Sequence, residues 1–134
     1  MHAGFFRRYS HALKGKRVLI VEDEALVAEI FQDALIEAGA EVVGPAVSAH
    51  DALLLIQGAT AADGLSAAIL DMNLDGAAMS TIADQLSASG VPFVRIAGYG
   101  GNPDGCVHAS SPVLVKPFSP GALVCTVRDL MVER

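Results

Sequence analysis

The sequence predicts an α/β fold in which helices cover both faces of a doubly wound parallel sheet. Short apolar runs rich in β-branched residues alternate with amphipathic segments along most of the chain, and this alternation is typical of parallel sheets. The runs have no polar–apolar alternation, as expected of strands that are covered on both faces. The chain has 134 residues, of which 52% are hydrophobic, so it can form one domain with a substantial core.

The first strand is predicted at residues 17–21 and the first helix at residues 24–38. Val18-Leu19-Ile20-Val21 is an uninterrupted apolar run, which favours a buried strand. Gly39 is expected to end the helix as a left-handed cap. Six apolar residues at helical spacing are expected to face inward: Leu26, Val27, Ile30, Phe31, Leu35 and Ala38.

The second strand–helix pair begins after that glycine. A short strand is predicted at residues 41–44, and Pro45 is expected to break it. The following helix is predicted from about residue 48 to residue 58. Ser48 followed three residues later by Asp51 resembles a capping box at its start.

The third strand is predicted at residues 67–71, the third helix at residues 77–88 and the fourth strand at residues 92–97. Gly90 separates the last two, and a glycine just past a helix is a common C-terminal cap. Four residues of the third helix are expected to face inward: Met79, Ile82, Ala83 and Leu86.

Residues 98–111 contain four glycines and Pro103 but no apolar period. They therefore predict a loop, with at most one helical turn, where strand–helix alternation would place a fourth helix. The fifth strand is predicted at residues 112–115. The last helix is expected to open at Ser119-Pro120, because proline is favoured in a first turn, and its inner stripe comprises Leu123, Val124, Val127, Leu130 and Met131.

Composition limits the partners. A net charge of −6 argues against a nucleic-acid ligand. No apolar stretch approaches the roughly 18 residues of a membrane span. No long apolar segment follows Arg7-Arg8, so the start of the chain does not resemble a secretory signal. Cys106 and Cys125 lack metal-ligand spacing and are expected to be reduced thiols in the cytoplasm.

Residues 1–15 show no clear period and are interpreted as an N-terminal arm, followed by one domain at residues 16–134. Three aromatic residues of the arm are Phe5, Phe6 and Tyr9. They could pack on the domain, pack on a partner or be disordered.

Polar residues follow three of the predicted strands. Glu22 and Asp23 follow the first, Asp71 ends the third and Lys116 follows the fifth. Carboxyl ends of parallel strands share one edge of the sheet, where such folds hold their chemistry. We expect Asp23 and Asp71 to bind Mg²⁺ directly, Glu22 to bind it through water, and a backbone carbonyl of the next turn, at Asn73, to complete the shell. Lys116 would then neutralise a phosphoryl group from the other side.

A simpler interpretation assigns these acids to helix capping. Negative charge is favoured at helix N-termini, and Glu22-Asp23-Glu24 directly precedes a predicted helix. Capping does not account for Asp23, Asp71 and Lys116 together, each at its own strand end.

At these residues the chain resembles the receiver domain of two-component response regulators, over roughly residues 17–131. The matching motifs are Val21-Glu22-Asp23-Glu24, Leu70-Asp71-Met72-Asn73-Leu74-Asp75-Gly76 and Val115-Lys116-Pro117-Phe118. The resemblance implies a flavodoxin-like five-stranded parallel sheet of order 2-1-3-4-5. It also implies Mg²⁺-dependent phosphorylation of Asp71 by a histidine kinase or histidine phosphotransfer protein.

Gly98-Tyr99 is similar to the "FAT GUY" receivers, which often have a degenerate fourth helix and are often single-domain proteins. Alignment on this pair places Ala97 where that subgroup has a threonine or serine, whose hydroxyl bonds the phosphoryl oxygen. Val113 occupies the position of the usual switch aromatic. Tyr99 could serve as an alternative mobile aromatic or simply pack on the sheet edge.

Arg95 is unusual because a charge in a core strand must reach water or a carboxylate. It could extend into an opening left by the missing helix, which would make that face a partner surface, or pair locally with an acid. His50 and His108 are interpreted as surface residues. Asn73 would lie beside the attacking water in dephosphorylation, unless it is a plain turn residue.

Three functions follow from these patterns. The first is a phosphoaccepting switch or phosphate shuttle that catalyses only its own phosphorylation and dephosphorylation, without an output domain in this chain. It would be a monomer or weak homodimer that signals to an unknown output protein. The second is an interaction module that works without phosphorylation, because Ala97 lacks the expected hydroxyl. The third, a phosphatase of the haloacid-dehalogenase type, is disfavoured because Asn73 replaces its second aspartate.

Overall fold

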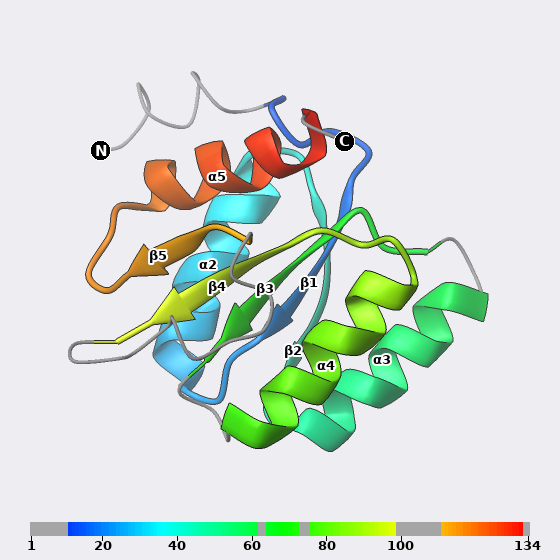
Figure 1. Cartoon of the computed structure of the whole chain (residues 1–134). Helices are drawn as coiled ribbons and strands as arrows, with labels where there is room; N and C mark the ends of the chain where they lie inside the picture. Colours follow the sequence, from blue (N-terminus) through cyan, green and yellow to red (C-terminus); the bar gives the residue numbers. More distant parts are fainter. Residues whose placement is uncertain (1–10, 62–63, 73–75, 99–110, 133–134) are drawn as a thin grey trace.

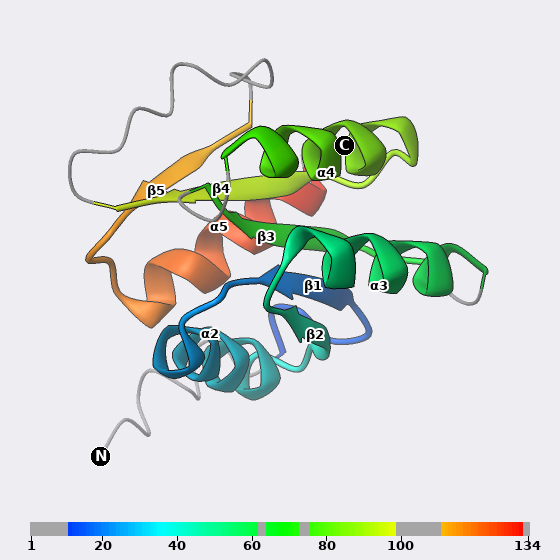
Figure 2. The same ribbon diagram turned by 90° about the horizontal axis from the view of Figure 1, so that it is seen from below.

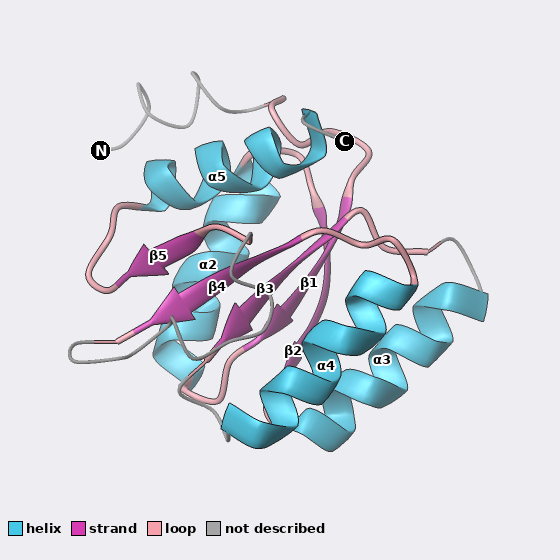
Figure 3. Ribbon diagram, in the orientation of Figure 1, coloured by secondary structure: helices cyan, strands magenta, loops and turns pink. Residues whose placement is uncertain are grey.

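Five parallel strands form a single sheet in the order β2-β1-β3-β4-β5. The computed structural model describes residues 11–61, 64–72, 76–98 and 111–132 (Figure 1). The predicted strand order and the flavodoxin-like fold are confirmed. Figure 3 shows the alternation of strands and helices along these residues. The elements are β1 (Arg17–Val21), α2 (Ala25–Glu37), β2 (Glu41–Ala46), α3 (Ala49–Ala61), β3 (Ala67–Asp71), α4 (Gly76–Ala88), β4 (Phe93–Ala97), β5 (Val113–Val115) and α5 (Pro120–Val132).

Helices cover both faces of the sheet: α2 and α5 pack together on one face, and α3 and α4 pack together on the other (Figure 2). Strand β1 shows why its sequence is a continuous apolar run. Val18 and Ile20 belong to the core beneath α2 and α5, whereas Leu19 and Val21 belong to the core beneath α3 and α4. Successive strand residues point to opposite faces, so a strand with two covered faces needs apolar residues throughout.

The inner face of α2 differs from the prediction. Phe31, Leu35 and Ala38 are buried as expected, but Leu26 is 77% exposed and Ile30 is 54% exposed. Small Ala28 and Ala34 are buried instead, which sets the contact line of the helix on the sheet. Apolar residues occur on almost every side of α2, so periodicity alone does not identify the side that faces the core.

Strand β2 continues through Pro45 to Ala46, so the predicted break at Pro45 is wrong. Two features accommodate the proline. β2 is an edge strand, where a missing N–H is tolerated, and its register against β1 shifts between Leu19 and Val21. Gly44 has φ of +97° at this irregularity, a conformation that favours glycine. As a result Ala46, rather than an earlier residue, meets the end of β1.

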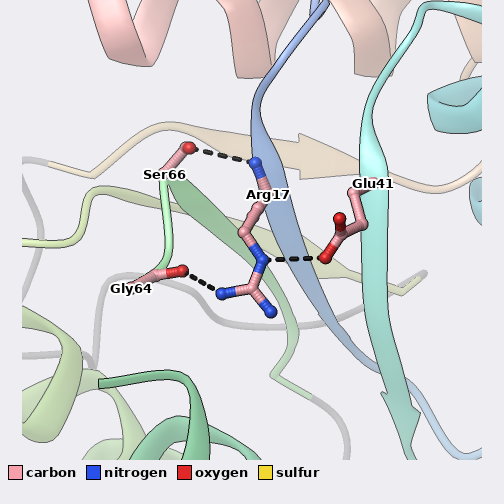
Figure 4. Close-up of polar contacts among 4 residues, drawn as sticks. All are labelled: Arg17, Glu41, Gly64 and Ser66. Atoms are coloured by element: carbon pink, nitrogen blue, oxygen red, sulfur yellow. Dashed lines mark hydrogen bonds and ion pairs between the residues drawn. The ribbon is translucent and has the colours of Figure 1, made fainter. Parts of the chain in front are cut away.

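The amino ends of three strands are joined by Arg17 (Figure 4). Its Nε donates a hydrogen bond to Glu41 Oε2 at 2.8 Å, and its Nη1 donates to the Gly64 carbonyl at 2.6 Å. Its backbone N–H donates to Ser66 Oγ at 3.0 Å. These contacts tie β1 to β2 and to the chain entering β3.

Leu13 is a core residue that sequence reasoning missed. It is fully buried among residues of α2, α5 and the sheet, and its backbone N–H donates to the Ala38 carbonyl at 2.9 Å. The segment just before β1 is therefore fixed to the C-terminal end of α2. The predictions for Phe5, Phe6 and Tyr9 lie outside the described residues.

Two predicted N-terminal caps are present. Ser48 Oγ accepts a hydrogen bond from Asp51 N–H at 3.1 Å, and Ser119 Oγ accepts one from Ala122 N–H at 3.1 Å.

Among the helices of the described residues, none is both long and apolar enough to cross a membrane.

Candidate functional site: an acidic cluster beside a lysine

The carboxyl ends of β1, β3 and β5 bring four predicted site residues together. One carboxylate oxygen from each of Glu22, Asp23 and Asp71 lies within 4.8 Å of the other two. Lys116 Nζ lies 3.5 Å from Glu22 Oε1. The parallel register explains this convergence, because β1 lies between β2 and β3, and the residues after each strand leave the sheet at the same edge.

Backbone hydrogen bonds fix where these side chains begin. Glu22 N–H donates to the Ala46 carbonyl at 2.9 Å, so the shifted end of β2 positions Glu22. Lys116 N–H donates to the Ala97 carbonyl at 2.8 Å, which extends the β4–β5 pairing to Lys116. Immediately after Asp71, Met72 N–H donates to a β4 carbonyl at 2.9 Å. Glu22, Lys116 and the residue after Asp71 are therefore each tied to a neighbouring strand.

The three carboxylates differ in solvent exposure. Glu22 is fully buried, Asp71 is 3% exposed and Asp23 is exposed. The pKa of Glu22 is raised from 4.5 to about 7. Burial is the main cause, and the contact with the Asp71 carboxyl is the second. The backbone N–H of Glu24 and the charge of Lys116 act in the opposite direction. Glu22 is thus a buried acid whose charged form lacks sufficient compensation.

The cluster fits a small hard cation. Glu22 Oε1 is buried and accepts no hydrogen bond within the described part of the chain, and buried polar atoms normally have partners. Three carboxylates gathered around one point match the oxygen ligands of Mg²⁺. Helix capping explains only part of the cluster: Glu22 Oε2 accepts a hydrogen bond from Glu24 N–H at 3.2 Å, but the N-cap residue Glu24 makes no side-chain capping bond and Asp71 is on another strand. Asn73, expected to contribute a carbonyl, lies outside the described residues.

The end of β4 supplies no hydroxyl beside this cluster. Ala97 is buried and pairs with Val115, and its neighbour Ile96 pairs with Asp71. Gly98 follows directly, whereas Tyr99 lies outside the described residues. The position where the resemblance implies a threonine or serine is therefore next to the strand residue that pairs with Asp71, and its side chain is a methyl group.

Arg95 is buried rather than extended into solvent. It is 3% exposed, and its Nη2 donates to the Ser111 carbonyl at 2.6 Å. In the sheet it pairs with Leu70 on one side and with half-buried Val113 on the other. Sequence reasoning did not anticipate a backbone carbonyl before β5 as a partner of Arg95.

An apolar groove adjoins Lys116 and was not anticipated. Its volume is about 210 Å³. Two of its lining residues, Phe31 of α2 and Phe118, stack with ring centroids 5.7 Å apart. The available signal was the presence of apolar residues on almost every side of α2, together with Pro117-Phe118. Its lining comprises Val27, Ile30, Phe31, Lys116, Pro117, Phe118, Pro120 and Leu123.

No family model matches the chain, and no curated protein matches it significantly. Solved structures do match. SdrG from Sphingomonas melonis Fr1 is 31% identical with a TM-score of 0.70, over 90% of this chain and 98% of that one. A putative response regulator from Chloroflexus aurantiacus J-10-fl is 28% identical with a TM-score of 0.73, over 89% and 99% of the two chains. A response regulator receiver domain protein from Clostridium thermocellum is 17% identical with a TM-score of 0.73, over 88% and 95%, a likeness of fold alone.

Proposed function

Because this chain belongs to the receiver domains of response regulators, we propose that it accepts a phosphoryl group on Asp71 in two-component signalling. One observation carries the proposal. Three carboxylates from two strand ends lie within 4.8 Å of one another, with Lys116 3.5 Å from Glu22. A cluster of acids beside one cation, at the edge of the sheet where such folds hold their chemistry, suits phosphoryl transfer.

In this proposal an Asp71 carboxylate oxygen attacks the phosphorus of a phosphohistidine. The new O–P bond forms as the N–P bond breaks, and the imidazole nitrogen keeps that electron pair. Lys116 balances negative charge on the phosphoryl oxygens. Glu22, Asp23 and Asp71 would hold Mg²⁺, which when bound would neutralise charge on the opposite side. Water later attacks the phosphorus of the acyl phosphate, which breaks the O–P bond, releases inorganic phosphate and restores the Asp71 carboxylate. The chain therefore catalyses only its own phosphorylation and dephosphorylation.

The proposed phosphodonor is a histidine kinase or histidine phosphotransfer protein, and the proposed receiver of the signal is a separate output protein. Asp23 is the exposed member of the cluster, which supports approach of a donor from the carboxyl edge of the sheet. The phosphoryl group is transferred only to the chain's own Asp71.

Incubation with acetyl phosphate and Mg²⁺ tests the proposal. Intact-protein mass spectrometry should find one added phosphoryl group on the wild-type chain and none on Asp71→Asn. Asp51→Asn is the matched control, because Asp51 is another acid, located at the start of α3. The Asp51 variant should be labelled like the wild type. An unlabelled wild-type chain with saturating Mg²⁺ would contradict phosphoacceptance.

A second function is favoured by Ala97. Its methyl group cannot donate the hydrogen bond that couples phosphorylation to conformation in the resembling family, so the chain could act as an interaction module that does not depend on phosphorylation. An output partner captured equally by the wild type and by Asp71→Asn would support this function. A partner captured only by the phosphorylated wild type would exclude it.

A further inference from the structure

The outer stripe of α2 changes character along its length. Leu26, Ile30, Asp33 and Glu37 are all exposed and follow one another at spacings of four, three and four residues. Side chains at these spacings share one helix face. The stripe is therefore apolar at the N-terminal end of α2, beside the acidic cluster, and acidic at the C-terminal end.

The apolar end of this stripe borders the groove beside Lys116. Ile30 contributes to both, and the other residues that line the groove are almost all apolar. Leu26 and Ile30 are 77% and 54% exposed. An apolar stripe joined to an apolar groove is a surface that a monomer normally covers or uses for binding.

The N-terminal segment leaves the domain at the acidic end of the same stripe. Leu13 is buried, and its hydrogen bond to the Ala38 carbonyl holds it at the C-terminal end of α2. Figure 1 shows this start of the described chain at the end of the sheet opposite the carboxyl ends of the strands. The described chain therefore begins at the end of α2 that carries Glu37.

The order of residues in the arm complements the stripe. Read backward from Leu13, the arm has Arg8 and Arg7, then Phe6 and Phe5. Read away from Leu13, the helix has acids first and apolar residues next. Acids would thus meet arginines, and the groove would meet the phenylalanines.

The arm is also long enough to reach the groove. The rise along α2 from Ala38 to Ile30 is about 12 Å. The seven residues from Leu13 back to Phe6 span about 23 Å when extended and about 10 Å when helical. Helical spacing matches the stripe. Phe5 would lie about 12 Å from Leu13, level with Ile30, and Arg8 would lie about 7.5 Å from it, level with Asp33. An extended arm would carry both arginines past Ile30, so the docked arm is helical or similarly compact.

We propose that residues 1–10 dock along the outer stripe of α2, with Phe5 and Phe6 in the groove and Arg7 and Arg8 over Asp33 and Glu37. The docked arm covers the surface next to Lys116. If the proposed function holds, a protein phosphodonor that uses this surface must displace the arm, whereas a small phosphodonor need not. A short tether gives an effective concentration in the millimolar range, so even a weak contact lowers the open fraction by about tenfold.

A spin label on the arm tests the docking without any phosphorylation. The label is placed at Ala3→Cys in a full chain that also carries Cys106→Ser and Cys125→Ser, with the Ile and Leu methyl groups isotope-labelled. The methyl signals of Leu26 and Ile30 should broaden, whereas those of Leu54, 54% exposed on α3, should not. Equal broadening at Leu54, or none at Ile30, would overturn the proposal.

A mixed sample separates this occupant from a second copy of the chain. Spin-labelled protein without isotopes is added to isotope-labelled protein without a spin label. No broadening is expected, because the contact lies within one chain. Broadening of Ile30 in the mixture would identify a second copy as the occupant and overturn the proposal.

Charge exchange tests the orientation of the arm. Arg7→Glu with Arg8→Glu should abolish the broadening at Ile30, and the further changes Asp33→Arg with Glu37→Arg should restore it. Broadening that is unchanged by the arginine substitutions would overturn the proposed pairing.

The apolar dye 1-anilinonaphthalene-8-sulfonate tests access to the groove. Its affinity should rise about tenfold in Phe5→Ser with Phe6→Ser, and unchanged affinity would overturn the docking. Acetyl phosphate labelling of Asp71 should be equal in this variant and the wild type. If neither the variant nor the wild type is labelled, the proposed function is contradicted, but the spin-label result still stands. Failure of the proposed function can therefore be told apart from failure of the docking proposal.

Discussion

Lys116 and Glu22 are separated by 3.5 Å at their charged atoms, but Lys116 is partly exposed and Glu22 is fully buried. The partial exposure of Lys116 weakens its attraction for Glu22, because water screens exposed charges. Burial and the contact with Asp71, which both raise the pKa of Glu22, therefore outweigh the effect of Lys116. The lysine offsets only part of the cost of a cluster of negative charges.

The first prediction concerns pH and stability without metal. The pKa of Glu22 is 4.5 ordinarily and about 7 in the fold, so between these values the folded state holds a proton that the unfolded state has lost. The free energy of unfolding should therefore fall as pH rises through this window, by up to about 3 kcal/mol. Chemical denaturation in EDTA at several pH values measures it.

Glu22→Gln supplies the control for this prediction, because glutamine has no carboxyl proton to lose. Subtracting its pH profile from that of the wild type isolates the contribution of Glu22. Addition of Mg²⁺ should stabilise the wild type most above about pH 7, where Glu22 is charged. Parallel profiles for the two chains would contradict the prediction.

The second prediction concerns Lys116→Met, which removes the ammonium and keeps much of the side-chain length. Labelling of Asp71 by acetyl phosphate should slow by about 10²-fold, the scale expected when one group that stabilises transition-state charge is lost. Lys16→Met is the control, since Lys16 is exposed at the opposite end of β1. Equal rates in the two variants would mean that Lys116 has no part in phosphoryl transfer.

The third prediction concerns Gly44 in β2. A Cβ there would lie 2.8 Å from Ala46 N and 3.0 Å from the Ile20 carbonyl oxygen, at φ of +97°. Gly44→Ala should lower the free energy of unfolding by about 1–3 kcal/mol. Because Ala46 holds Glu22, Mg²⁺ affinity should fall as well.

Gly58→Ala is the opposite case and serves as the comparison. Gly58 lies within α3, and a Cβ there would meet nothing within 4 Å. Alanine in a helix is more stable than glycine by about 0.5–1 kcal/mol, so this variant should be stabilised. Denaturation curves that shift in the same direction for both glycines would refute the argument from backbone strain.

The sequence was sufficient for the strands that are buried on both faces. Val18 to Val21 and Ala67 to Leu70 are short continuous apolar runs that end at polar residues, which favours strands covered on both faces, and they are buried as expected. The polar residues that follow such runs are then placed by register alone. That is why Glu22, Asp23, Asp71 and Lys116 could be expected to meet, as the structure places them.

Features that depend on contacts between elements could not be predicted in this way. Leu26 and Ile30 are exposed because small alanines set the contact face of α2. Pro45 remains in β2 because that strand is at the sheet edge and its register shifts. Leu13 is buried because the core extends below β1 to the end of α2. None of these is encoded in local periodicity.

The last prediction concerns the methyl group of Ala97. Ala97→Thr should introduce a hydroxyl that can donate to a phosphoryl oxygen on Asp71, and a hydrogen bond to a charged group contributes about 1.5–3 kcal/mol. That corresponds to roughly 10- to 150-fold in the equilibrium between two conformations. Methyl NMR spectra before and after labelling with acetyl phosphate should then show larger shifts in Ala97→Thr than in the wild type. Ala97→Val is the matched control, since valine has nearly the shape of threonine but no hydroxyl. If the valine variant responds to phosphorylation as strongly as the threonine variant, packing rather than the hydrogen bond controls the switch.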